Sequence, residues 1–110
     1  MAESYTVIVT EPAEQDLEEL LEYITERDGS SSAESMRDAI VDAIEALAKM
    51  PDRYGRVREV LHFKDIIYRR VVVKNRYRVM YKVEELEKDV YVVRILHVKR
   101  GPGFVKNALK

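Results

Sequence analysis

Several side chains in the second half of the chain belong to types that bind phosphate or move protons. They are the basic residues Arg69, Arg70, Arg78, Lys99 and Arg100, the aromatic Tyr68, and the titratable Glu59 and His97. An arginine guanidinium donates two parallel hydrogen bonds to a phosphate, and a tyrosine ring can stack on a base. Histidine and glutamate serve as general acids or bases. Side chains of these types could together form a surface for phosphates and stacked bases.

Charge is divided unevenly between the two halves of the chain, although the net charge is only −1. Residues 1–50 contain 13 acidic and 3 basic residues, whereas residues 51–110 contain 7 acidic and 16 basic residues. A basic face attracts polyanions by releasing their counterions. Alternatively, the two halves neutralise each other where they pack. The charge pattern alone leaves both interpretations open.

Length and composition predict a single domain over residues 1–110. No apolar run approaches the roughly 20 residues that span a bilayer. The first residues lack the basic start and apolar stretch of a secretory signal, and the chain has no cysteine. We therefore expect a cytoplasmic protein that does not enter a membrane. With only His62 and His97 as soft ligands, we expect neither a metal site nor a cofactor.

The first half of the chain predicts one strand and two helices. Residues Tyr5–Val9 alternate in β-forming side chains, which predicts a first strand. Apolar residues then recur at helical spacing from Pro12 to about Arg27, and a proline suits the first helical turn. Residues 28–30 break this helix before a second apolar stripe from Met36 to Leu47. The two helices should form an antiparallel hairpin.

From residue 51 onward, β-branched residues and turn sequences predict mostly strands. In chain order, we place these strands near Arg58–Phe63, Ile67–Val73, Tyr77–Val83 and Val90–Val98. The connections between them are short, so neighbouring strands should be antiparallel. After the last strand, residues 104–109 predict a short helix or a frayed terminus.

The element order β-α-α-β-β-β(β) predicts an α+β fold. Such a chain builds a twisted, mostly antiparallel sheet with the two-helix hairpin on one face, and the other face should then be open. In the strand Tyr77–Val83, alternation places Tyr77 and Tyr81 on one side and Arg78 on the other. If Arg70 faces the same way as Arg78, one face presents arginines and tyrosines together.

Short segments spread over nearly the whole chain occur in an order that is typical of one protein family. They are Ala13-Glu14-Gln15-Asp16-Leu17 with Tyr23-Ile24, Ala43-Ile44-Glu45-Ala46-Leu47 with Pro51, Tyr68-Arg69-Arg70, Tyr77-Arg78-Val79-Met80-Tyr81 and Ile95-Leu96-His97-Val98-Lys99-Arg100. Together they resemble the RelE/ParE superfamily, the toxins of bacterial type II toxin–antitoxin pairs. The helical hairpin, and Leu96-His97 before the final basic pair, look more like ParE than RelE.

The resemblance implies the α+β fold above, a cognate antitoxin that wraps the toxin, and one of two targets. ParE-like members poison DNA gyrase. RelE-like and YoeB-like members instead cut messenger RNA on the ribosome without a metal. A third alternative is an inactive relative that only binds an antitoxin.

If the chain cleaves RNA, the resemblance implies roles for particular residues. Such cleavage requires a base, cations around the phosphorane and an acid for the leaving oxygen. Arg78 matches the arginine that contacts the scissile phosphate, and Arg100 aligns with a second family arginine. Arg69 and Arg70 resemble the basic pair on the neighbouring strand. Glu59 lies about where YoeB-like enzymes carry their glutamate base.

Two further residues, Tyr68 and Lys99, complete the target-binding surface that we expect. Tyr68 could stack on a base, although such a residue can also simply pack. Lys99 adds a cation beside Arg100. The competing interpretation for Arg78 is structural, because its stem could pack on Met80 while its head pairs with a glutamate.

The chain departs from the RNA-cleaving members near its C-terminus. Those members carry an aromatic hydroxyl or a His-Tyr pair there, whereas this chain offers only Phe104, which cannot transfer a proton. His97 could substitute for the missing group, but alternation places it on the same side as Val93 and Ile95, so we expect it to point toward the core. We therefore expect a toxin that arrests growth. Inhibition of DNA gyrase is the preferred prediction for its action, and cleavage of messenger RNA is the alternative.

Overall fold

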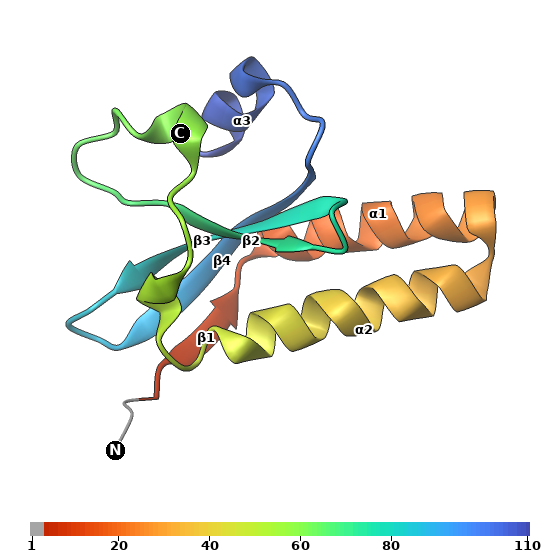
Figure 1. Cartoon of the computed structure of the whole chain (residues 1–110), viewed down its shortest axis with the longest axis horizontal. Helices are drawn as coiled ribbons and strands as arrows, with labels where there is room; N and C mark the ends of the chain where they lie inside the picture. Colours follow the sequence, from red (N-terminus) through yellow and green to blue (C-terminus); the bar gives the residue numbers. More distant parts are fainter. Residues whose placement is uncertain (1–3) are drawn as a thin grey trace.

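A twisted four-stranded sheet forms the centre of the computed structural model, which describes residues 4–110 (Figure 1). Its strands are β1 (Thr6–Val9), β2 (Arg69–Val73), β3 (Tyr77–Glu84) and β4 (Asp89–His97). The strand order is β1-β4-β3-β2. β4 pairs antiparallel with β3 and parallel with β1, and β2 pairs antiparallel with β3. The sheet is therefore mostly antiparallel, and the prediction of an α+β fold is confirmed.

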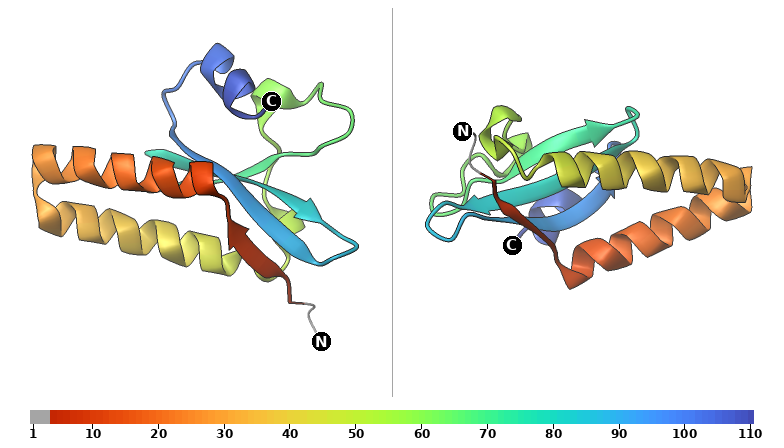
Figure 2. Two further views of the ribbon diagram at one scale, coloured as in Figure 1. Left: turned by 180° about the vertical axis from the view of Figure 1, so that it is seen from behind. Right: turned by 90° about the horizontal axis from the view of Figure 1, so that it is seen from below.

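Two long helices follow β1 and form the predicted antiparallel hairpin. α1 spans Glu11–Asp28 and α2 spans Ser30–Ala46. Gly29 alone separates them, with a φ of 94° that side chains with a Cβ rarely adopt. In the two views of Figure 2 the hairpin extends well past the sheet, so its far end lies away from the strands.

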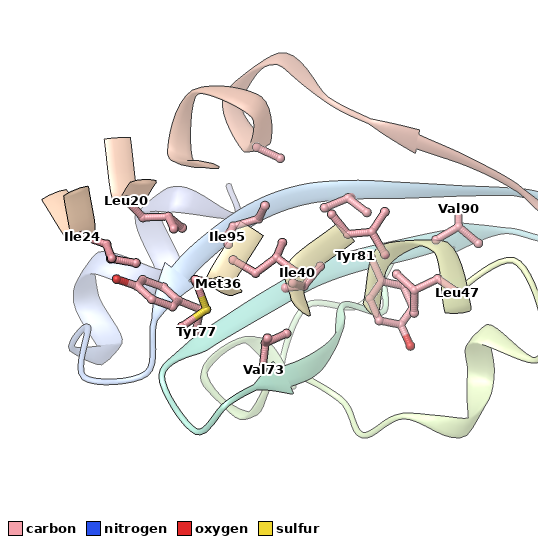
Figure 3. Packing of buried hydrophobic residues seen from close by; sticks show 14 of the residues in the cluster. Leu20, Ile24, Met36, Ile40, Leu47, Val73, Tyr77, Tyr81, Val90 and Ile95 are labelled. Atoms are coloured by element: carbon pink, nitrogen blue, oxygen red, sulfur yellow. The ribbon is translucent and has the colours of Figure 1, made fainter. Parts of the chain in front are cut away.

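The main core lies between this hairpin and one face of the sheet (Figure 3). Ile40 of α2 is fully buried against the strands, as are Val79 and Tyr81 of β3. The Tyr81 hydroxyl donates a hydrogen bond to the carbonyl of Pro51, and burial raises the pKa of this tyrosine. Tyr77 and Tyr81 are thus core residues, as the alternation of the strand predicted.

The opposite face of the sheet is covered, and the prediction of an open face was wrong. The residues that cover it come from the segment before β2 and from α3 (Pro102–Ala108), above the sheet in Figure 1. They form a second buried cluster with the sheet, which comprises Val57, Val60, Tyr68, Met80, Leu96, Val105 and Leu109. A small sheet with apolar side chains on both faces must bury both of them, which a hairpin on one face alone does not achieve.

The strand predicted at Arg58–Phe63 is also absent. This part of the chain contains the 3-10 helix η2 (Arg58–Val60), which follows another short one, η1 (Pro51–Arg53). The reason is the spacing of the buried residues. Val57 and Val60 are three residues apart and both buried, which fits one 3-10 turn, whereas a strand alternates every second residue.

None of the helices within residues 4–110 combines the length and the apolar character needed to cross a membrane.

Candidate functional site

Arg78 is a buried cation on the face of the sheet that α3 covers. The residue is 9% exposed, and its Nη1 donates to both carboxylate oxygens of Glu59, at 3.1 and 3.0 Å. Its Nε and Nη2 are buried without a hydrogen-bond partner among residues 4–110. Glu59 belongs to η2, so this ion pair fastens η2 to the middle of the sheet. The Arg78 side chain is 11% exposed, so solvent reaches little of it.

The strand register decides which of the predicted arginines share a face with Arg78. Arg70 lies opposite Met80 in β3, and therefore on the same face as Arg78, which the sequence alone left conditional on the register. Arg69 lies opposite Tyr81, on the face that the helices cover. The Arg69-Arg70 pair is therefore split between the two faces and does not act as one basic patch.

Both arginines of β2 contact the segment that precedes η2. Arg69 donates from Nη1 to the carbonyl of Tyr54 at 2.7 Å and lies 4.0 Å from Asp52. The guanidinium of Arg70 lies so close to Gly55 that a Cβ there would meet its Nη1 at 2.4 Å. Each side chain therefore helps to hold this segment against the sheet edge.

Tyr68, which the sequence offered as a stacking platform, is buried in the second cluster. Its side chain packs edge-on against Phe63, with ring centroids 6.3 Å apart, and burial raises its pKa. With 9% of the residue exposed, the ring offers little surface to a base. Its position favours the packing alternative.

His97 ends β4 on the face that the helices cover, opposite Tyr77. The two rings meet edge-on with centroids 5.2 Å apart, and Nδ1 of His97 accepts the backbone N–H of Lys99 at 3.0 Å. This bond places the proton of the neutral ring on Nε2. Burial lowers the pKa of His97, and the charges of Lys99, Arg100 and Arg76 lower it further.

His97, Lys99 and Arg100 line a groove of about 750 Å³ between α1, the end of β4 and the start of α3. The other charged and aromatic residues that line this groove are Asp16, Glu19, Tyr23, Arg27, Asp28, Arg76, Tyr77, Arg94 and Phe104. We call it the α1–β4 groove. Its lining combines five Lys or Arg residues with three acidic residues, so it is basic.

Asp16 closes one side of the α1–β4 groove, and sequence reasoning gave it no role. Its carboxylate accepts hydrogen bonds from Nε and Nη2 of Arg94, at 2.7 and 2.9 Å, and from the backbone N–H of Ile95 at 2.9 Å. The hydrogen bond to Asp16 raises the pKa of Arg94. β1 pairs with residues 89–92 of β4, so Asp16 covers the edge beyond the end of β1. The signal in the sequence was an arginine inside an otherwise apolar strand.

Comparison with models of protein families assigns the chain to a family. Residues 7–102 match the family described as ParE toxin of type II toxin-antitoxin system, parDE. The chain belongs to this ParE toxin family. A comparison with curated protein sequences found no match.

Two solved structures share the fold of this ParE-family toxin. One is described as a chromosomal ParDE toxin–antitoxin system from P. aeruginosa, with a TM-score of 0.73 and 19% identity over 89% of this chain and 100% of that chain. The other is the RelBE2 toxin–antitoxin complex from Mycobacterium tuberculosis, with a TM-score of 0.58 and 23% identity over 88% and 94% of the respective chains. At sequence identities of 19% and 23%, these likenesses show that the fold is shared and nothing further.

The ParE-family toxin does not gather the residues that RNA cleavage would use around one point. Arg78 and Glu59 pair with each other on the face that α3 covers, whereas His97 lies on the opposite face. Arg100 is exposed beyond β4, with its guanidinium 4.4 Å from the ring centroid of Phe104. Sequence alternation predicted the faces of Arg78 and His97, but the ion pair and the position of Arg100 required the structure.

We expect His97 of the ParE-family toxin to make stability depend on pH in a defined direction. Its pKa is lower in the folded than in the unfolded chain, so the unfolded chain binds more protons near the ordinary value of about 6.5. The contribution of neutral His97 to the free energy of unfolding is therefore fully present above the ordinary pKa of about 6.5, and is lost as pH falls through the folded-state pKa. A His97→Gln variant should show a flatter fall in unfolding free energy between about pH 7 and 5.

This effect can be measured by urea denaturation at a series of pH values. The control is His62→Gln, which removes the other histidine at an exposed position. Equal slopes for His97→Gln and the unmodified protein would contradict the prediction.

Proposed function

We propose that this ParE-family toxin arrests growth by inhibiting DNA gyrase, and that it acts as a binding protein rather than as a ribonuclease. The observation that carries the proposal is the Arg78–Glu59 ion pair, with 3.0 Å between Nη1 and the carboxylate. The two residues that would supply phosphate binding and base catalysis neutralise each other. The match to the ParE family over residues 7–102 supports the same target.

The rest of the would-be catalytic set gives further support. A general base or acid must reach the reacting phosphate together with the cations that stabilise it. His97 lies on the face of the sheet opposite Arg78, and Phe104 has no proton to transfer. Ribonuclease activity would therefore require both the release of Arg78 from Glu59 and a proton donor from another part of the molecule or from a partner.

The helical hairpin is the surface that we propose for contact with gyrase. It extends past the sheet in Figure 2, and Tyr23 on α1 is 54% exposed. A protruding helix pair presents a convex surface that can enter a groove of a large partner. The exposed side chains of α1 are mostly acidic, which suits a basic site on that partner.

We also propose a cognate antitoxin as partner, because both similar structures are described as toxin–antitoxin systems. Apolar side chains before and within β2 suit such a contact. Leu61, Ile67 and Val72 are each between 44% and 50% exposed.

Co-expression with the product of the neighbouring reading frame should give a complex of both chains. Replacing Ile67 and Val72 by aspartate should weaken that complex.

The target can be identified with two parallel assays on the purified toxin. We expect the toxin to inhibit supercoiling of relaxed plasmid by gyrase and to leave ribosome-bound messenger RNA intact. The variant Arg78→Met with Glu59→Leu removes the ion pair as a unit and should still inhibit gyrase. Messenger cleavage that Arg100→Gln abolishes, with normal supercoiling, would identify a ribonuclease. No effect in either assay would indicate an inactive relative.

A further inference from the structure

Three cations of the α1–β4 groove have no acidic partner. Arg76, Lys99 and Arg100 line the groove, and none of them forms an ion pair within residues 4–110. All three act on the same imidazole, because each lowers the pKa of His97. Their charges therefore converge on one region, where an anion would replace the missing counter-charge.

The acidic residues of the groove do not neutralise this region. Asp16 is already engaged by Arg94 and the backbone of Ile95. Glu19 and Asp28 lie on α1, whereas Lys99 and Arg100 lie beyond the end of β4. An anionic group would therefore sit at the end of the groove formed by the β4–α3 connection and avoid the carboxylates of α1.

Aromatic rings stand on both walls of the same groove. Tyr23 on α1 is 54% exposed and Phe104 on α3 is 43% exposed. Each ring has a guanidinium beside it, with Arg27 at 5.6 Å from the Tyr23 centroid and Arg100 at 4.4 Å from the Phe104 centroid. Aromatic rings and guanidinium planes both stack on nucleobases.

His97 adds a hydrogen-bond donor to the groove lining. Its Nδ1 accepts the backbone N–H of Lys99, so Nε2 of the neutral ring carries the proton. The groove volume of about 750 Å³ lies within the usual range for sites that hold a small molecule. It suits one nucleotide unit and is too small for a duplex, which needs an extended surface.

We propose that the α1–β4 groove binds a nucleoside phosphate, with its phosphate on Arg76, Lys99 and Arg100 and its base against Phe104. The ligand is either a free nucleotide or one unit of a single strand, since the chemistry is the same. This proposal does not depend on gyrase inhibition, because it follows from the cations and aromatic rings that line the α1–β4 groove.

Direct binding to the intact toxin tests the proposal. The probes are adenosine monophosphate, followed by calorimetry, and a fluorescent single-stranded DNA hexamer, followed by anisotropy. We expect Arg76→Gln with Arg100→Gln to weaken binding at least about tenfold. For the hexamer, this variant should also reduce the slope of log affinity against log salt by roughly 1.4. The matched control is Arg37→Gln with Arg58→Gln, two exposed arginines outside the groove, which should bind as the unmodified protein does.

A second variant tests the aromatic part of the site. Phe104→Ala removes an exposed ring and should weaken nucleotide binding about fivefold, with no effect on the binding of pyrophosphate. Binding of adenosine monophosphate alone supports a free nucleotide as ligand, binding of the hexamer alone supports a strand, and binding of both supports the nucleotide chemistry that they share. The proposal is overturned if neither probe binds or if the Arg76 and Arg100 double variant keeps full affinity. It is also overturned if pyrophosphate binds as tightly as the nucleotide and Phe104→Ala binds the nucleotide with full affinity.

Discussion

Replacement of Glu59 by alanine is expected to lower the free energy of unfolding by about 2 to 3 kcal/mol. The variant leaves the guanidinium of Arg78 buried without its counter-charge, and two of its nitrogens already lack a partner among residues 4–110. Removal of one member of a fully buried pair costs about 3 to 5 kcal/mol, and the 19% exposure of the Glu59 side chain places this pair somewhat below that range. Urea denaturation measures the effect.

Two comparisons show that the cost comes from the uncompensated charge. The variant with Arg78→Met and Glu59→Leu removes both charges and should regain most of the lost stability, because apolar side chains can replace a buried ion pair. Glu84→Ala removes the partner of Lys82 from a pair with a half-exposed glutamate, and should change stability by less than about 0.5 kcal/mol. If Glu59→Ala is as stable as the unmodified protein, the ion pair does not hold η2 to the sheet.

A comparable or larger loss, about 3 kcal/mol, is expected for Ile40→Ala. Ile40 is completely buried and lies in Figure 3 between α2 and the strands, so its truncation leaves a cavity that the rigid sheet cannot fill. In a chain of this size the melting temperature should fall by more than about 10 °C. Thermal unfolding followed by circular dichroism measures this shift.

The matched control is Val72→Ala on β2, which shortens a side chain that is 44% exposed. It should cost less than about 1 kcal/mol, because the transfer and cavity contributions are both small there. Equal losses for the two variants would mean that α2 does not pack on the sheet as described.

The helices could be predicted from sequence because their stability comes from local pattern. The apolar stripe of α1 and α2 repeats over several turns, and Gly29 breaks it at one point. The segment around η2 could not be predicted in the same way. Val57 and Val60 are β-branched and favour a strand by propensity. Both are buried in one cluster with Met80 and Leu96 of the sheet, and this burial imposes a 3-10 turn.

The candidate site shows the same division between local and long-range information. Alternation along β3 correctly placed Arg78 on the face opposite Tyr77, because strand geometry fixes the side of each residue, but only the register with β2 shows that Arg70 shares the face of Arg78. What covers that face depends on residues from two other parts of the chain. The pairing of Arg78 with Glu59, and of Arg94 with Asp16 across 78 positions, leaves no periodic trace in the sequence.

The parallel pairing of β1 with β4 also determines when the toxin can finish folding. Thr6 pairs with Asp89 and Val9 with Val92, so the first strand of the chain needs the last one as its partner. The helical hairpin can form from local contacts while the chain is being synthesised, but contacts between such distant segments form late. A nascent chain on the ribosome therefore keeps β1 without its neighbour until residues 89–97 have emerged. The four-stranded sheet can therefore form only after β4 has been translated.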